Sequence, residues 1–496
     1  MSPRNPVRAL RAALLASTAV VAGCAVGPDF ERPTAPKTEA YTPTPIVEMP
    51  PAGGAARQRV SYGKDVAADW WKNFGSPELD DVVALAIENS PTLESSRQVL
   101  AAAREQVTVA TAPLFPSLDL AADASRSRSR GSSGSGGSST RAGATYANSF
   151  SAGPLVSYNL DIWGATRRSI EQSSALAEFQ RYQLGVAYLT LTGSAVTQAI
   201  TIALQRAQID LVNELIKLDR ENLDLTRASY EGGRSARTDV LAAESQLTAD
   251  QTLLPPLNQS LAVARHALSV LAGHAPADWT PPDFDLDKLK VPEELPVHLP
   301  SELVHQRPDI LAAEATLHAS SAAIGIATAN LYPNLQLTAS WSRTGPNPAA
   351  LFDSTSTIWS IAAGLTQPLF HGGELLATRR AAVDTFRADL ADYRDTVVVA
   401  FGQVADVMRA LEHDAQFLEA ERTAMDAAQA SADLIQESYR VGQASLLQVL
   451  DARRLWFQAQ LGFVRATASR LLDTVQLYQA MGGAWTGYAP AQAQTD

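Results

Sequence analysis

The 496-residue sequence predicts an α+β fold that is built twice from the same order of elements. Two blocks match each other, residues 91–126 and residues 308–343. Each block continues into a second strand-like run, a very long helical pattern, a glycine turn and a return helix. The strand-like runs alternate apolar and polar residues, and the helices carry heptad stripes. We interpret the chain as two internal structural repeats, because chance matches would not recur in the same order.

Composition excludes several classes of protein. The formal net charge of −12 argues against a nucleic-acid partner. A single cysteine excludes an internal disulfide framework and a cysteine-rich metal site. No apolar run of about 20 residues follows the N-terminus, so no transmembrane helix is expected. A membrane-spanning part, if there is one, must then be a closed β-barrel.

The first residues have the pattern of a secretion signal. Three arginines precede an apolar stretch, and we assign residues 1–23 to a signal peptide. Residues 21–24 resemble a bacterial lipobox, which predicts that Cys24 carries a diacylglycerol and an N-acyl chain such as palmitate. A chance cysteine after an ordinary signal peptide is the alternative. Ala25 is not aspartate, which suits sorting to the outer membrane; the lipid anchors this end without spanning the bilayer.

The remaining chain divides at changes of composition. Residues 28–51 are rich in proline and threonine and bury little. Ordered structure begins at Trp70, and Ser76 followed by Pro77 is a helix start. The predicted boundaries are residues 24–75 for a lipidated extended segment, 76–290 for the first repeat, 291–485 for the second repeat and 486–496 for a flexible tail.

Each repeat offers two strands. In the first strand of the first repeat, Leu118, Leu120 and Ala122 alternate with mostly polar residues. Residues 126–141 are rich in serine, glycine and arginine; we expect a long hairpin loop, with an interdomain linker as the alternative. The matching loop near residues 345–348 is predicted as a turn. Four strands alone leave open edges, so strands that span a membrane must close with those of other protomers.

The helices are unusually long. The helix predicted over residues 164–230 would run about 100 Å. Its return helix, residues 235–271, contains Pro255 and Pro256, which should kink or split it. Gly273 and Gly482 are expected to close the two return helices. Leu211, Leu215, Leu218 and Leu225 are predicted to continue the apolar stripe of the first long helix. The second repeat carries a stripe from Val383 to Tyr439, and another through Leu447, Leu450, Arg454, Phe457, Leu461, Val464, Ala468, Leu471, Val475 and Tyr478.

Arg454 is a charge on an otherwise apolar stripe. Asp451 precedes it by three residues, so Leu447, Asp451 and Arg454 share one face next to the turn at Gly442. Spacing alone allows an ordinary ion pair within one helix, worth about 0.5 kcal/mol. It equally allows a ring of charge in a pore when several copies meet at an axis.

No residue pattern indicates catalysis. The sequence contains no phosphate-binding glycine loop and no nucleophile elbow. None of the seven histidines has metal-ligand spacing to a cysteine or carboxylate cluster. We predict that the protein is not an enzyme and binds no metal.

From Cys24 to Trp485 the chain resembles the TolC- and OprM-like outer-membrane efflux channels, in the lipoprotein branch that serves RND-type pumps. The motifs that carry the resemblance are Cys24-Ala25-Val26-Gly27-Pro28, Trp70-Trp71-x-x-Phe74, Tyr158-x-Leu160-Asp161-Ile162-Trp163-Gly164, Arg307-Pro308-Asp309-Ile310, Pro368-Leu369-Phe370 and Leu450-Asp451-Ala452-Arg453-Arg454. The resemblance implies a homotrimer, in which four strands per protomer form one outer-membrane β-barrel continuous with a periplasmic α-helical coiled-coil barrel.

The same resemblance implies passive conduction of drugs or other small toxic compounds. An inner-membrane RND-type pump would supply the energy, and a periplasmic adaptor would dock on the hairpin tips and open them. It places the periplasmic gate at Tyr439, Leu447, Asp451 and Arg454, and the adaptor contacts at Gly232, Gly233, Val441 and Gly442. The alternatives are the duct of a type I protein secretion system and a non-conducting, lipid-anchored coiled-coil spacer.

Overall fold

The computed structural model describes residues 25–46, 48–50, 57–130, 144–353, 356–483 and 485. The signal peptide, Cys24 and the C-terminal tail lie outside these residues. The chain forms two compact units. Unit 1 comprises Met1–Arg32, Ala101–Glu178 and Glu314–Asp392, and unit 2 comprises Pro33–Leu100, Phe179–Ala313 and Tyr393–Asp496. Each unit therefore takes segments from both sequence repeats.

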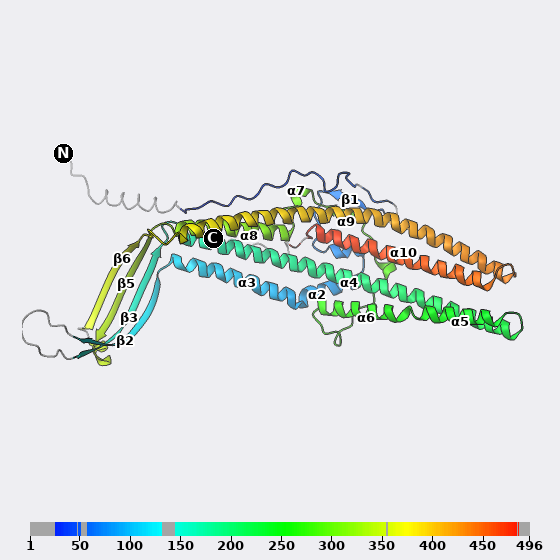
Figure 1. Cartoon of the computed structure of the whole chain (residues 1–496), viewed down its shortest axis with the longest axis horizontal. Coiled ribbons are helices and arrows are strands. Elements are labelled where there is room, and N and C mark those ends of the chain that lie inside the picture. The colour runs from blue at the N-terminus through cyan, green and yellow to red at the C-terminus, as the bar shows by residue number, and fades with distance from the viewer. Residues whose placement is uncertain are drawn as a thin grey trace, which may run out of the picture. The chain divides into compact units, whose positions relative to one another are not determined.

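Unit 1 contains the four predicted strands in one antiparallel sheet (Figure 1). The strands are β2 (Ser117–Arg130), β3 (Ala144–Leu160), β5 (Asn334–Gly345) and β6 (Thr357–Thr366), in the order β2-β3-β5-β6. The register pairs Leu118 with Val156, Tyr158 with Leu337, and Trp341 with Trp359. The edge strands β2 and β6 have no partner on their outer sides within this sheet, so the open edges expected from the sequence are present.

The hairpin predicted around residues 126–141 is confirmed, because β2 and β3 pair on either side of it, but its first five residues are strand, and residues 131–141 lie outside the described part of the chain. Strand β2 continues through Arg130 into the stretch expected to be a loop, and Arg126 pairs with Asn148. The guanidinium groups of Arg126 and Arg128 lie 5.2 and 5.5 Å from the ring centroid of Tyr146, which favours continued pairing of the strands. The predicted turn near residues 345–348 needs correction. The partner connection holds a 3₁₀ helix, η4 (Pro348–Phe352), rather than a simple turn, and Asn347 caps it by accepting from the Ala350 amide at 2.9 Å.

The helices agree with the predicted repeat. Helices α3 (Pro91–Thr111) and α8 (Pro308–Ala329) precede the strands in the two repeats, and α4 (Ala165–Glu231) and α9 (Glu374–Arg440) follow them with 67 residues each. The return of the first repeat is split into α5 (Arg237–Gln251) and α6 (Leu254–Leu271), as the proline pair predicts. The return of the second repeat is one helix, α10 (Leu446–Ala480). Gly273 and Gly482 follow α6 and α10 with φ angles of 78° and 84°.

Shorter elements complete the chain. Helix α2 (Pro77–Asn89) begins after Ser76, whose hydroxyl accepts from the Leu79 amide at 3.3 Å. Strands β1 (Arg59–Tyr62) and β4 (Glu294–Val297) form a parallel pair. The others are η1 (Trp70–Phe74), η2 (Ala112–Leu114), η3 (Leu286–Lys288) and α7 (Pro300–Leu303).

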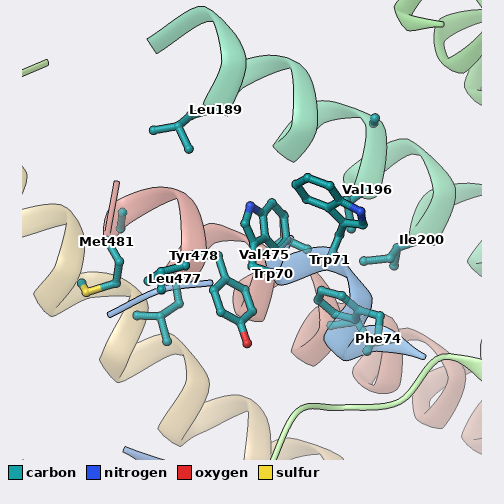
Figure 2. Close-up of a cluster of buried hydrophobic side chains, with 14 of the residues drawn as sticks. Trp70, Trp71, Phe74, Leu189, Val196, Ile200, Val475, Leu477, Tyr478 and Met481 are labelled. Carbon is teal, nitrogen blue, oxygen red and sulfur yellow. The ribbon is translucent and has the colours of Figure 1, made fainter. Parts of the chain in front are cut away.

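The largest apolar cluster of unit 2 surrounds η1 (Figure 2). The Trp70 ring stacks on Tyr478 of α10, with centroids 5.0 Å apart and planes 24° apart. Val196 and Ile200 of α4 are fully buried in the same cluster. The short aromatic segment before the first repeat thus joins the first long helix to the last one.

Close to the hairpin turns the predicted stripes are wrong at some positions, although Leu450 and Phe457 are buried as predicted. Leu447 is 72% exposed and Arg454 is also exposed, whereas Val449, Leu450, Ala452 and Phe457 form the buried face of α10. Leu225, expected on the stripe of α4, is 70% exposed. On α10 the exposed and the buried members of the predicted stripe alternate within the first heptads, so the packed face is rotated away from the predicted one and keeps only part of the stripe.

Two helices contain windows that are long and apolar enough to cross a membrane, contrary to the expectation of none. They are α4 and α8, and 61% and 72% of the respective windows are buried inside the protein. Burial of this extent is typical of core helices, which pass the same test of length and composition.

Candidate functional site

The two hairpin turns of unit 2 have the same backbone structure, and they lie at the same end of the unit (Figure 1). In the first turn, the Gly233 amide donates to the Tyr230 carbonyl and the Arg234 amide donates to the Ser229 carbonyl, at 2.9 and 2.8 Å. In the second, Gly442 donates to Tyr439 at 3.0 Å and Gln443 donates to Ser438 at 2.8 Å. Both are Schellman motifs, which end a helix by satisfying its last carbonyls.

Glycine is required in these turns by the backbone and not by packing. Gly233 and Gly442 have φ angles of 70° and 78°, in the left-handed region, and a Cβ on either would meet nothing within 4 Å. The turns are open to solvent, since Val441 beside Gly442 is 64% exposed. All four residues predicted as adaptor contacts, Gly232, Gly233, Val441 and Gly442, lie in these two turns and are accessible.

The return helices begin differently. Ser445 caps α10 with a full capping box, in which its hydroxyl accepts from the Gln448 amide at 3.3 Å and the Gln448 side chain accepts from the Ser445 amide at 2.7 Å. Before α5 the equivalent position is Ala236, whose amide donates to Asp239 at 3.2 Å but whose methyl group accepts nothing. The start of α10 is therefore the more firmly capped of the two.

Leu447, Asp451 and Arg454 share one exposed face of α10 directly after its start. Arg454 Nη2 donates to Asp451 Oδ1 at 2.7 Å, and both side chains are more than half exposed. Tyr439 is 38% exposed on α9, and among the described residues no hydrogen bond links it to either charge. In one protomer the structure therefore brings together three of the four predicted gate residues, while nothing within the described part of the protomer covers them.

The tip also contains a charged cluster that the sequence stripes did not predict. Asp219 of α4 is 4% exposed and faces Asp250 of α5, which accepts from Gln246 at 2.8 Å. Burial, followed by the hydrogen bond and negative charge of Asp250, raises the pKa of Asp219 to about 7, and Arg453 of α10 opposes the increase. Arg453 donates to Gln436 of α9 at 3.0 Å. Asp219 was missed because the leucines beside it in the sequence suggested a different face.

A second acidic pair lies across the other hairpin. Burial, followed by the hydrogen bond and charge of Asp473 on α10, raises the pKa of Asp414 on α9 to about 7. Arg470 opposes this increase and is itself fully buried, so burial lowers the pKa of its guanidinium. Its Nε donates to Gln58 Oε1 at 3.0 Å. Gln58 belongs to the extended N-terminal segment, which therefore contributes a polar contact to the helical core.

The model of the outer membrane efflux protein family matches residues 82–274 and 299–483 of the chain. The chain belongs to this family. As an outer membrane efflux protein, it is the outer-membrane channel component of an efflux system and not an enzyme. The two matched ranges each cover one helical hairpin and the strands before it, as expected for the two repeats.

Curated relatives cover nearly the whole efflux protein. It is 30% identical over 494 residues to the probable efflux pump outer membrane protein TtgC of Pseudomonas putida, covering 97% of this chain and 98% of that one. It is 29% identical over 453 residues to the pyoverdine export outer membrane protein OpmQ of the same species, covering 91% and 96%. Relatives of these names rule out the interpretation as a non-conducting spacer.

Solved structures confirm the fold class. The outer-membrane channel OprN aligns with a TM-score of 0.81 at 26% identity, over 93% of this chain and 100% of that chain. The MtrE outer membrane channel of Neisseria gonorrhoeae aligns with a TM-score of 0.80 at 24% identity, over 93% and 99%. The four-stranded sheet and the paired long helices are thus those of an outer-membrane channel that extends into the periplasm.

Proposed function

We propose that this efflux protein is a trimeric duct that conducts drugs or other small toxic compounds and opens at its hairpin tips. The observation that carries the proposal is the uncovered face of Leu447, Asp451 and Arg454 beside a firmly capped turn. Three copies of this face around an axis form an apolar constriction next to a ring of charge. The edge strands β2 and β6 then pair between protomers, giving a closed barrel of twelve strands.

In the closed state, the Asp451 carboxylates of the trimer repel one another unless cations neutralise them. Arg454, 2.7 Å away on the same helix, supplies one such cation per protomer. An exposed pair of this kind contributes at most about 1 kcal/mol within one chain. The pair therefore acts in the gate through interactions between the Asp451–Arg454 pairs of different protomers around the axis. Tyr439 is a further hydrogen-bonding group there.

We expect the double substitution Asp451→Ala with Arg454→Ala to raise single-channel conductance in planar bilayers by about twofold or more, because it removes the charge and bulk that close the pore. The matched control is Asp384→Ala with Arg387→Ala, an exposed pair of the same spacing on α9 at 3.1 Å. Conductance equal to that of the unmodified channel in both variants would remove the gate assignment.

A periplasmic adaptor of an RND-type pump is the proposed partner at the turns. Val441 offers an exposed apolar side chain next to Gly442, and Gly232 and Gly233 offer bare backbone in the first turn. We expect Val441→Asp to reduce co-purification of a co-expressed adaptor about tenfold, since it places a charge in an apolar contact. Val398→Asp, at a 68% exposed valine of α9 outside the turn, is the control and should bind normally. Equal capture by both variants would place the adaptor elsewhere.

Acylation of Cys24 is proposed as the anchor of this end of the chain. The support is the lipobox-like sequence at residues 21–24 and the absence of other cysteines from the sequence. Mass spectrometry of the N-terminal peptide should show a diacylglycerol and an amide-linked acyl chain on this residue, whereas an unmodified or uncleaved N-terminus contradicts the proposal.

A further inference from the structure

The residues directly after Cys24 lie against α4 and α8 in unit 1. The Val26 amide donates to the Trp163 carbonyl at 3.0 Å. Arg168 of α4 then faces the segment, donating to the Val26 carbonyl at 3.4 Å and to Asp29 Oδ1 at 2.7 Å. The Arg168 side chain is only 6% exposed, whereas that of Asp29 is 93% exposed. A buried guanidinium thus holds an otherwise exposed segment.

Three glycines allow the backbones to touch. A Cβ on Gly27, which has a φ of 105°, would lie 2.5 Å from Gly325 Cα on α8. A Cβ on Gly164 would lie 2.7 Å from Ala25 Cα, and one on Gly325 would lie 2.8 Å from the Arg168 side chain. A side chain at any of these places forces a shift, because real Cβ atoms do not approach so closely. The groove is shaped for this backbone.

The far end of the segment is held by side chains. The Phe30 ring stacks on His318 of α8, with centroids 4.4 Å apart and planes 16° apart. His318 Nε2 lies 3.0 Å from Glu171 Oε1, and the other Glu171 oxygen accepts from Arg168 at 2.7 Å. Arg32 closes the series with an ion pair to Glu314 at 2.6 Å. These contacts form one connected network with the groove, so the segment from Ala25 to Arg32 is held at both ends.

The near end of the segment lies beside a stacked tryptophan–tyrosine pair of the kind that is typical of the membrane–water interface. Trp163, whose carbonyl binds Val26, stacks on Tyr332 with centroids 4.7 Å apart. The Trp163 indole donates to the Pro333 carbonyl at 2.9 Å, which fixes the ring next to the start of β5. Tryptophan and tyrosine gather at the level of lipid headgroups, because their rings have one apolar and one polar side.

We propose that residues 25–32 are a docking strap that holds the acylated N-terminus at the Trp163 end of β3, with Arg168 as the positioning residue. The proposal rests on the proposed acylation of Cys24 for its purpose, but not for the docking itself. If the eight residues of the strap were released from the groove, they could extend and carry the lipid up to about 28 Å from the point where the strap begins. Docked, the strap keeps the acyl chains within two residues of an interfacial tryptophan.

The test is cleavage by a glutamate-specific protease after Glu31 in the purified full-length channel. Although Glu31 is exposed, docking protects this bond by holding the backbone in place, since a protease needs a locally freed segment. We expect Gly27→Ala, and separately Asp29→Ala with Phe30→Ala, to speed this cleavage about tenfold or more. The matched control is Gly63→Ala, at a glycine with a φ of 75° where an added Cβ would meet nothing within 4 Å, and this variant should be cleaved at the original rate.

Further variants separate docking from mere stability. The two substitutions on the strap should leave the melting temperature and the conductance unchanged, because they remove nothing from the helices. Arg168→Met should release the strap and Arg168→Lys should partly restore protection. Original cleavage rates in Gly27→Ala and in the strap double variant would overturn the proposal.

Cys24→Ala distinguishes this proposal from that of acylation. If the groove holds the strap, this variant remains protected although it carries no lipid. Loss of protection in Cys24→Ala would show that the attached lipid, and not the groove, holds the segment, and would overturn the docking strap. An N-terminal peptide without acyl chains in the unmodified protein would instead contradict the acylation, while the cleavage rates would still report on docking.

Discussion

Trp70→Ala is expected to lower the free energy of unfolding by about 3–5 kcal/mol. Trp70 is 1% exposed and stacks on Tyr478 (Figure 2). Its ring also meets those of Trp71 and Phe74 edge to face, with ring centroids 5.9 and 6.3 Å apart. Its indole nitrogen has no hydrogen-bond partner within the described part of the chain, so the loss is one of packing. The cavity would open between α4 and α10, which the aromatic segment joins.

The measurement is the melting temperature of the purified channel in detergent, which should fall by roughly 3–5 °C. Phe352→Ala is the matched control, because this aromatic side chain is 85% exposed on η4 and its removal opens no cavity. A drop of similar size in both variants would show that detergent binding, and not the core around Trp70, sets the melting temperature. An unchanged value for Trp70→Ala would contradict the central place given to η1.

Much of the fold was predictable because the sequence contains two repeats with the same order of elements. Gly233 and Gly442 recur at equivalent places after equally long helices, and each ends its helix in the same motif. Pro255 and Pro256 marked the break between α5 and α6, because proline cannot continue the hydrogen bonds of a helix. Local chemistry decides such features, so one sequence suffices to find them.

The features that the sequence did not predict depend on which helix faces pack against each other. Leu447 and Arg454 followed the stripe but proved exposed, since the hairpin packs through a neighbouring face of α10. Asp219 and Asp250 are 31 positions apart and become neighbours only when α4 and α5 pair. A polar residue at a helix–helix contact looks like a surface residue until its partner helix is placed. Of the gate, the sequence could therefore supply the shared face but not the acidic pairs behind it.

Replacing the buried Asp219 and the half-buried Asp414 by asparagine, Asp219→Asn with Asp414→Asn, is expected to stabilise the channel at pH 8 and to have little effect near pH 4.5. The pKa of each carboxyl is raised from 3.8 to about 7, first by burial and then by the neighbouring carboxylate. An asparagine amide can donate to that neighbour without a proton. The asparagine therefore provides at every pH the hydrogen bond to the neighbouring carboxylate that a protonated aspartate provides only in the acidic range.

The direction in which stability changes with pH follows from proton binding by the folded and unfolded chains. Between about pH 4 and 7 the folded chain keeps a proton on Asp219 and on Asp414 that the unfolded chain has released. Stability contributed by these groups is thus complete below pH 4, falls as the pH rises towards 7, and is gone above it. Arg453 faces the first pair and Arg470 the second, and they offset part of the repulsion. We expect a gain of about 1–2 kcal/mol per pair at pH 8.

The two pairs lie on different hairpins, so their effects should add. Melting temperatures measured from pH 4.5 to 8 should separate progressively, with the double variant the more stable at the alkaline end. Asp224→Asn is the matched control, since Asp224 is exposed on the same helix as Asp219 and its substitution should shift the curve little. A constant difference across the pH range would mean that the asparagines act through packing alone. A separation that grows with pH would mean that each hairpin is held together in part by a shared proton, which lies between α4 and α5 in the first hairpin and between α9 and α10, the helix that carries the gate, in the second.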